Sequence, residues 1–270
     1  MKMDNVIKIA VYTLRDQLRH KSVYLLLGLC ILFILMIRGC YDGDYIVNGK
    51  MVDNTLVAWH VSKIGFHLIT VGMLLMACML SMKIFSRDHA DGSAVLFLSR
   101  PVFRWQYVLG RITGTWVLCL VFMFTLHATL FLTVWTKTGT IILGYLIASV
   151  VCSLSLLFVI VTVSFLSLFL PDFISALFTM GILFVGFISD GGYKMINSEV
   201  VRSAAPSINV EPAFWRILYP KVFMVQAYAD TLISNSVFHN MGSVHPLLNL
   251  SFWIVLIVAL MLALFNRKEI

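Results

Sequence analysis

Long apolar runs separated by shorter polar segments make up most of the chain. Six of these runs are long enough to cross the hydrocarbon core of a bilayer, which is about 30 Å thick. They occupy residues 22–37, 64–82, 112–135, 141–170, 173–189 and 247–265. A segment that crosses lipid must pair its backbone polar groups internally, so each run predicts a helix and not an isolated strand. The pattern therefore predicts an all-α, polytopic membrane protein with six spans in a single domain over residues 1–270.

The fourth run, 141–170, is too long for one upright helix. We expect it to tilt or to break, with Ser153–Ser155 as the candidate position for a break. Pro171 and Asp172 follow this run and predict a tight turn. Asp172 is then expected to cap the fifth helix.

The polar N-terminal segment, residues 4–21, has the pattern of an amphipathic helix. Ile7, Ala10, Leu14 and Leu18 recur at helical spacing along one stripe, and the basic residues lie elsewhere on the helix. We therefore expect an interfacial helix that lies on the inner surface of the membrane.

The segment between the last two runs, residues 190–246, is expected on the outer side. Its stretch 214–233 is apolar but is interrupted by polar residues: Arg216, Pro220, Lys221, Gln226 and Asp230. Pro220 could open a short helix. That helix would place Val222, Val225, Ala229 and Leu232 on one side. The sequence leaves open whether this stretch lies at the interface or is embedded in the membrane.

The composition and the charge agree with a lipid environment. Hydrophobic residues make up 60% of the chain and charged residues only 12%, against roughly a quarter charged in soluble domains. The net charge is +7. The Lys and Arg residues flank the apolar runs, which favours a topological and headgroup role over nucleic-acid binding. Six spans place both termini on one side, which also holds 12 of the 20 Lys and Arg residues. We therefore expect both termini in the cytoplasm and the protein in the cytoplasmic (inner) membrane.

No motif in the sequence predicts a metal, a cofactor or a catalytic centre. The five cysteines form no CxxC pair, which argues against a disulfide framework or a zinc site. Methionines recur at positions 73, 76, 79 and 82, but helix rotation turns Met73 and Met82 to nearly opposite sides, so packing is favoured over a Cu(I) path. His67 and His127 lie within spans without a ligand partner on the same helix. We expect each to bond a neighbouring helix.

The absence of acidic residues from the predicted spans and the absence of a nucleotide-binding motif both indicate an external source of energy. No Asp or Glu lies inside a predicted span, since Asp172 and Asp190 stand at span ends. Ion-coupled carriers usually need intramembrane carboxylates. The sequence contains no GxxxxGK[ST], HExxH or GxSxG motif. An ion-coupled carrier, a channel and an intramembrane enzyme are therefore less favoured, and any ATP hydrolysis is expected in a partner chain.

The loop at 83–111 carries a pattern of its own. An acidic residue precedes Gly-Ser by four positions, and an apolar run, Arg-Pro-Val, Arg, Tyr and Gly-Arg follow. This pattern resembles the cytoplasmic coupling loop of type-2 ATP-binding-cassette permeases, nearest the branch linked to multicopper-enzyme maturation and gliding motility. That family usually has Glu at position 88 and Thr at position 93. The matching positions are Asp88, Gly92, Ser93, Arg100, Pro101, Arg104, Tyr107, Gly110 and Arg111.

The resemblance implies a function and a set of partners. A short helix in 92–100 would couple the chain to a cytoplasmic P-loop ATPase dimer. A second copy of the permease, or a homologous permease, would complete the transporter, which we expect to be an exporter. Spans without charge suit an amphipathic or apolar cargo, whose identity the sequence does not give. The alternative from another class is a membrane scaffold or assembly subunit without transport.

Overall fold

The computed structural model of the chain is built from α-helices. Its described residues are 2–19, 54–82, 84–85, 103–139, 141–196, 219–238 and 244–267, with two short strands and isolated positions between 23 and 39. In chain order the elements are α1 (Lys2–Leu18), β1 (Ile46–Val47), β2 (Lys50–Met51), α3 (Asn54–Ser81), α6 (Arg104–Thr138), α7 (Gly144–Leu166), α8 (Asp172–Ile196), α11 (Val222–Ser234) and α12 (Pro246–Arg267). The strands β1 and β2 form one antiparallel pair.

Five of these helices are long and apolar enough to cross a membrane by length and composition: α3, α6, α7, α8 and α12. This confirms the prediction of an all-α, polytopic membrane protein. The predicted first span at 22–37 lies outside the described residues, except for a few isolated positions. The predicted coupling helix within 92–100 lies wholly outside them.

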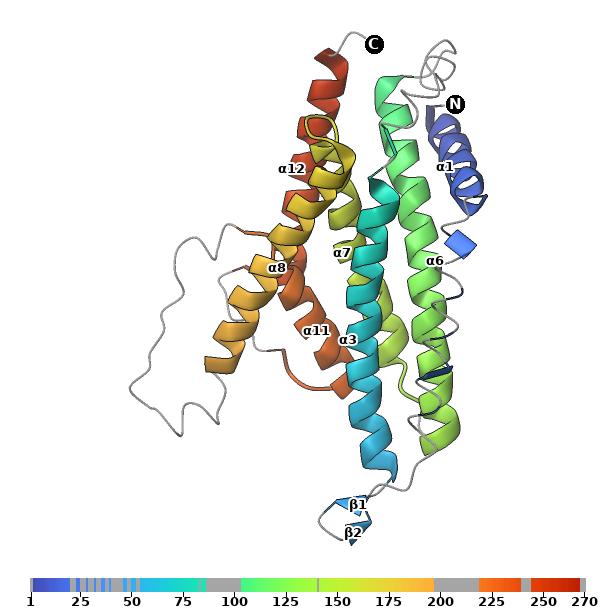
Figure 1. Cartoon of the computed structure of the whole chain (residues 1–270), viewed down its shortest axis with the longest axis vertical. Coiled ribbons are helices and arrows are strands. Elements are labelled where there is room, and N and C mark those ends of the chain that lie inside the picture. Colours follow the sequence, from blue (N-terminus) through green and yellow to red (C-terminus); the bar gives the residue numbers. More distant parts are fainter. Residues whose placement is uncertain are drawn as a thin grey trace.

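Neighbouring spans run in opposite directions, so the ends of several helices lie together at one end of the bundle. Figure 1 shows α1, the end of α3, the start of α6, the α7–α8 turn and the end of α12 at this end, which we call the α1 end. The strands β1 and β2 lie at the opposite end, which we call the hairpin end. The connection from α3 to α6, which carries the predicted coupling loop, therefore begins and ends at the α1 end.

Two helices begin earlier than their apolar runs predict. Helix α3 starts at Asn54 and α6 at Arg104, so the predicted loop 83–111 ends at Phe103 and not at Arg111. At the start of α6 the Gln106 side chain accepts a hydrogen bond of 3.1 Å from the Phe103 N–H, which satisfies a backbone donor there. At its other end α6 stops at Gly139, whose φ of +68° is the left-handed conformation that glycine tolerates.

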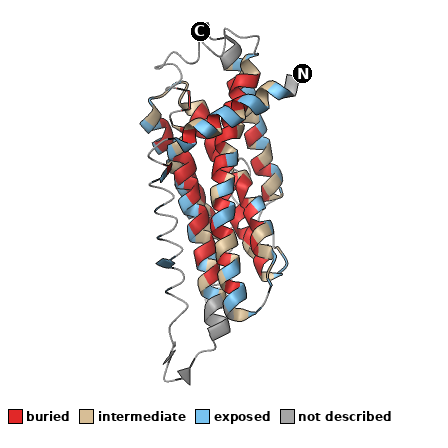
Figure 2. Ribbon diagram, turned by 90° about the vertical axis from the view of Figure 1, so that its right-hand side faces the viewer, coloured by how far each residue is buried: buried red, intermediate tan, exposed pale blue. Residues whose placement is uncertain are grey.

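Helix α7 is the central helix of the bundle. Within its apolar stretch 67% of the residues are buried, against 28% in α8. Figure 2 shows buried residues in the interior of the bundle and exposed residues on its outer faces. The break considered at Ser153–Ser155 is absent, because α7 continues unbroken to Leu166. The Ser153 hydroxyl bonds the Val150 carbonyl at 2.6 Å, so it is satisfied within the helix. The long run instead ends in the turn at 167–170, and Asp172 is the first residue of α8.

Helix α8 is longer than predicted, and this changes the status of one carboxylate. It continues to Ile196, so Asp190 lies inside the helix and not at the end of a span. Asp190 is 1% exposed and accepts a hydrogen bond from the Tyr219 hydroxyl. The prediction that spanning helices contain no internal carboxylate is therefore wrong for α8. The sequence hid this because the two glycines and the tyrosine after Asp190 end the apolar run without ending the helix.

Helix α11 starts after Pro220, as predicted, and packs against α7, α8 and α12. Val222, Val225 and Ala229 are buried in that packing. The close approach of α11 to α7 depends on Gly144, where a Cβ atom would overlap the Leu232 carbonyl oxygen. This helix is therefore held within the bundle, towards the hairpin end (Figure 1).

Candidate functional site

The predicted coupling residues divide into two groups. Arg104, Tyr107, Gly110 and Arg111 lie on the first turns of α6, whereas the motif had placed them in a loop. The other members lie outside the described residues: Asp88, Gly92, Ser93, Arg100 and Pro101. Of the described members, Gly110 and Arg111 lie on the surface of α6 that α1 covers.

Two glycines let α1 approach α6 closely. A Cβ atom at Gly110 would lie 2.7 Å from the Ile9 Cβ, and one at Gly114 would lie 2.6 Å from the Ala10 carbonyl oxygen. Glycines four residues apart lie on one face of a helix, and such small residues allow helix backbones to meet in membranes. We call this contact the α1–α6 seam; its members are Ile9, Ala10, Thr13 and Gln17 of α1 and Gly110, Arg111, Gly114 and Thr115 of α6.

Arg111 fixes the polar part of the seam. Its side chain is 4% exposed, and Nη1 donates a hydrogen bond to the Thr13 hydroxyl at 3.4 Å. The guanidinium also lies 5.6 Å from the ring centre of Tyr12 and 5.8 Å from that of Tyr107. A buried guanidinium needs hydrogen-bond and aromatic partners to offset its lost hydration. The arginine of the Gly-Arg motif therefore holds α1 in place.

Further contacts tie the seam to its neighbours. The Gln17 amide donates to the Thr115 hydroxyl at 2.8 Å, which joins α1 to α6 one turn further along. Tyr107 is 1% exposed, and its ring centre lies 6.2 Å from that of Phe85, just beyond the end of α3. The end of α3 and the start of α6, which flank the predicted coupling loop, are thus packed together with α1 in one unit.

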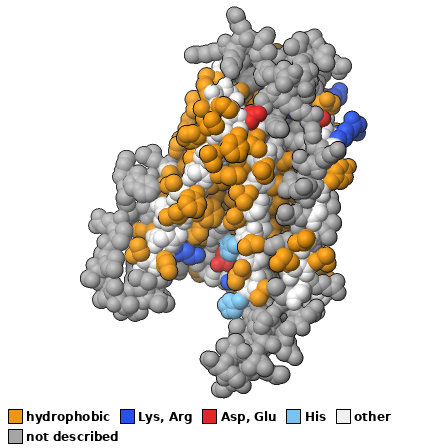
Figure 3. Space-filling view, in the orientation of Figure 1, with side chains coloured by type: hydrophobic (Ala, Val, Ile, Leu, Met, Phe, Trp, Pro, Cys, Tyr) orange, Lys and Arg blue, Asp and Glu red, His pale blue; other side chains and the backbone are white. Residues whose placement is uncertain are grey.

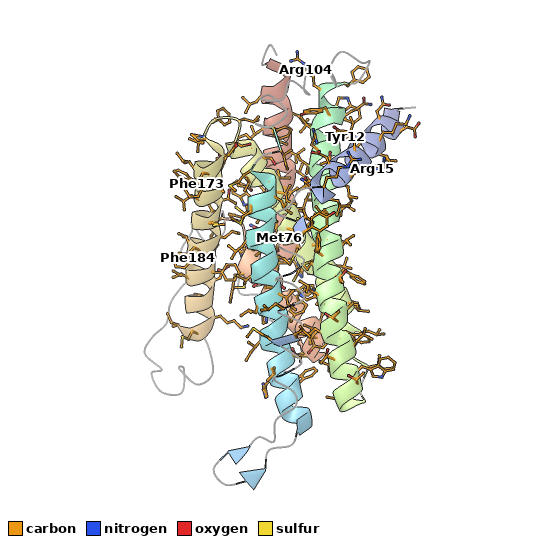
Figure 4. The ribbon with its side chains drawn as sticks, turned by 45° about the vertical axis from the view of Figure 1, so that its right-hand side comes forward. Tyr12, Arg15, Met76, Arg104, Phe173 and Phe184 are labelled. Carbon is orange, nitrogen blue, oxygen red and sulfur yellow. The ribbon has the colours of Figure 1, made fainter. Side chains whose placement is uncertain are left out.

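The exposed surface of α1 differs partly from the predicted stripe. Ala10 faces α6 and does not join Ile7 and Leu18, which are 58% and 40% exposed. Val11 takes its place on the exposed apolar stripe. Lys8, Arg15 and Arg19 are exposed beside this stripe. Figure 4 shows Tyr12 and Arg15 on α1 and Arg104 at the same end of the molecule. The pairing of an apolar and a basic exposed stripe is typical of interfacial helices.

A second group of polar side chains lies towards the hairpin end. The Lys63 Nζ and the His67 Nε2 of α3 lie 3.7 Å and 3.8 Å from the same oxygen of Asp230 on α11. The Lys63 ammonium also lies 5.1 Å from the Trp59 ring centre. The neighbouring His67 and Lys63 hold the pKa of the Asp230 carboxyl below its ordinary value, although burial opposes them. We call Lys63, His67 and Asp230 the charged cluster.

A family comparison decides the class of the chain. The model of the ABC-2 family transporter proteins matches residues 7–270. The chain belongs to the ABC-2 transporter family. No curated protein matches the sequence. The predicted type-2 ATP-binding-cassette permease family is thus confirmed, and the chain is a multi-pass membrane permease of that family.

The remaining predictions for this ABC-2 permease concern its histidines and methionines. The His127 Nε2 lies 3.5 Å from the Thr70 hydroxyl of α3, and its ring stacks on Phe66 with 4.2 Å between ring centres. His127 of α6 therefore contacts α3, and His67 of α3 contacts Asp230 of α11, so each histidine contacts a neighbouring helix, as predicted. Met73 is buried while Met79 is 59% exposed, so these methionines do not line one path. Within the described residues, no three His, Cys, Asp or Glu side chains could hold a metal ion together.

Sequence reasoning missed the charged cluster. Its local signal is Lys63 and His67 at the spacing i, i+4, which places both cations on one face of α3. Their acidic partner stands far away in the chain, on a helix whose position in the permease could not be predicted. The glycine pair Gly110 and Gly114 was also readable as a small-xxx-small pattern, of which only Gly110 was used.

Proposed function

We propose that this ABC-2 permease is the membrane subunit of an exporter that a separate cytoplasmic P-loop ATPase dimer drives. Two permease chains would form the transporter, as the family resemblance implies. The α1 end would face the cytoplasm, with both termini inside and the protein in the cytoplasmic membrane. The positive-inside rule supports this orientation, because the exposed basic stripe of α1 belongs to that end.

The observation that supports the proposal most directly is that both flanks of the predicted coupling loop belong to one packed unit, formed by α1, the end of α3 and the start of α6. The loop leaves the end of α3 next to Phe85 and returns at the start of α6, and Tyr107 contacts Phe85 between them. The close approach at Gly110 and the hydrogen bond of Arg111 to Thr13 hold α1 against the same part of α6. A push by an ATPase on the loop would therefore move α1, α3 and α6 together.

Helix α6 is suited to carry that movement across the membrane. It has 35 residues, which corresponds to a length of about 52 Å at the usual rise per residue. This exceeds the thickness of the hydrocarbon core. Helix α6 also packs along α7, the central helix, so its displacement would reach the hairpin end of the bundle.

The test uses the loop residues that the family motif provides. Arg100→Glu and Pro101→Leu are expected to abolish the coupling of ATP hydrolysis to the permease while leaving its membrane insertion intact. The assay is the ATPase activity of the co-purified complex in proteoliposomes, alongside the amount of ATPase that copurifies with the permease. Arg15→Glu on the exposed face of α1 is the matched control for charge reversal at the same end.

The outcomes separate clearly. Loss of copurified ATPase or of permease-dependent hydrolysis in both loop variants, with normal values for Arg15→Glu, supports the proposal. Wild-type coupling in both loop variants, or failure of the wild-type permease to bind any P-loop ATPase, would count against it. The second result would favour the scaffold alternative.

A further inference from the structure

The charged cluster lies where two spanning helices diverge. At the α1 end α3 and α8 are in contact, with the Cys78 thiol 3.5 Å from the Ala176 carbonyl oxygen. Towards the hairpin end the two helices separate, and α11 lies between them (Figure 1). Figure 3 shows Lys or Arg, Asp or Glu and His side chains gathered around a hollow in this opening. The cluster side chains remain partly accessible, with 24% exposure for Lys63, 38% for His67 and 28% for Asp230.

Among the described residues, the accessible charged side chains of this opening do not balance. Lys63 and His67 approach the single carboxylate of Asp230, and the positive charge of Lys194, near the end of α8, also acts on it. Lys63, Lys194 and Asp230 supply two ammonium groups and one accessible carboxylate, whereas Asp190, one turn before Lys194, is 1% exposed and accepts a hydrogen bond from Tyr219. At the edge of a membrane an excess positive charge is costly unless an anion or water approaches it. The opening therefore presents a surplus of donors for an anionic group.

An apolar surface continues from these charges towards the α1 end. On α3 a stripe of exposed side chains begins beside the cluster at Ile64 and continues through Leu68 and Leu75. On α8 the exposed side chains include Phe184 and Ile188. Figure 3 shows hydrophobic side chains covering this face. Figure 4 shows Phe184 on the outer side of α8, away from α3, so the apolar stripe that adjoins the cluster is that of α3. A cationic group at one end of a long apolar surface is complementary to a molecule with an anionic head and an apolar tail.

We propose that Lys63, His67 and Lys194 form a binding site for the anionic headgroup of a glycerophospholipid, with its acyl chains along the exposed apolar stripe of α3 that starts at Ile64. The ammonium groups donate to the phosphate oxygens, and Trp59 covers one side of Lys63 at the level of the headgroups. Asp230 limits the affinity, because its carboxylate competes with the phosphate for the same cations. The site is independent of the proposed function, since binding requires neither the ATPase nor transport.

The test measures lipid binding to the purified permease alone. The protein in dodecylmaltoside micelles is titrated with phosphatidylglycerol or with phosphatidylcholine of the same acyl chains, and retained adducts are quantified by native mass spectrometry. The wild type is expected to retain phosphatidylglycerol preferentially. Lys63→Gln and Lys194→Gln should each weaken that binding about tenfold, since each removes a charge-assisted hydrogen bond. Palmitate, a single-chain anion, serves as the competitor that tests for a free fatty acid instead of a phospholipid.

Asp230→Asn gives the decisive contrast. A headgroup site predicts tighter binding of phosphatidylglycerol in Asp230→Asn, because the competing carboxylate is removed. A purely structural ion pair predicts lower thermal stability in Asp230→Asn and in Lys63→Gln, with no such gain. Lys8→Gln on α1 is the control for loss of an exposed cation at the other end. If Lys63→Gln does not fold, Lys194→Gln still tests the site.

Several results would overturn the proposal. The first is equal retention of both lipids by the wild type. The second is unchanged phosphatidylglycerol binding in Lys194→Gln, or an equal loss in Lys8→Gln. The third is weaker binding in Asp230→Asn. Displacement of the phospholipid by equimolar palmitate would replace the proposed ligand by a free fatty acid and would also contradict the proposal.

Discussion

Gly114→Ala is the sharpest test of the α1–α6 seam. The added Cβ atom would lie 2.6 Å from the Ala10 carbonyl oxygen and 2.7 Å from the Thr13 Cβ. Both distances are shorter than real Cβ contacts, and the carbonyl belongs to the backbone of α1. No side-chain rotation relieves that overlap, so α1 must move away from α6.

The size of the effect follows from what the movement disturbs. Overpacking of a tight contact costs about 1–3 kcal/mol. The displacement also strains two hydrogen bonds, Gln17 to Thr115 and Arg111 to Thr13, each worth about 1 kcal/mol. Alanine favours a helix over glycine by roughly 1 kcal/mol, which offsets part of this loss. We expect a net destabilisation of about 2 kcal/mol, or roughly 4–8 °C in Tm for a protein of this size.

Gly181→Ala provides the matched control within α8. No atom lies within 4 Å of a Cβ built at Gly181, so the same substitution meets open space there. It should leave the Tm unchanged or raise it slightly. The assay is thermal unfolding of both variants in the same detergent, followed by fluorescence-detected size exclusion. Equal melting temperatures for Gly114→Ala and Gly181→Ala would show that the seam does not depend on close backbone contact.

Four further predictions test other parts of the structure. Gly144→Ala should displace α11 by overlap with the Leu232 carbonyl and lower the Tm, whereas Gly192→Ala, with open space around it, should not; equal behaviour would refute the α7–α11 contact. Tyr219→Phe removes the hydroxyl that donates to the buried Asp190 and should cost about 1–3 kcal/mol, measured by thermal unfolding against the exposed-site control Tyr24→Phe. Gln17→Leu should cost about 1 kcal/mol through loss of the bond to Thr115, and no loss would mean that this bond contributes nothing net. A C-terminal fusion should be active with green fluorescent protein and inactive with alkaline phosphatase, and the reverse result would invert the proposed topology.

The existence of the spanning helices could be predicted from the sequence because hydropathy is a local property. A run as apolar as 247–265 is stable only in lipid or in a protein core, and helix α12 includes the whole of it. The starts of α3 and α6 could not be predicted in this way. Both helices extend beyond their apolar runs into polar turns, where Lys63, Tyr107 and Arg111 make contacts with other helices.

The coupling motif was readable, but the role of its members was not. The family resemblance placed Gly110 and Arg111 in a loop facing a partner, whereas the structure places both on α6 against α1. The same limit applies to α1, whose pattern predicted an amphipathic helix but not which stripe faces α6. Ala10 is apolar enough for the exposed stripe and small enough for the seam, and only the position of Gly114 decides between them.

The lipid environment of this protein and its family could be predicted from the sequence, because these depend on local hydropathy and on one short motif. The tertiary structure decided which polar residues meet. Asp230 lies next to Lys63 and His67, and Asp190 next to Tyr219, although each pair is separated by a long stretch of chain. Such pairs depend on how helices pack, and many helix arrangements satisfy the same hydropathy pattern.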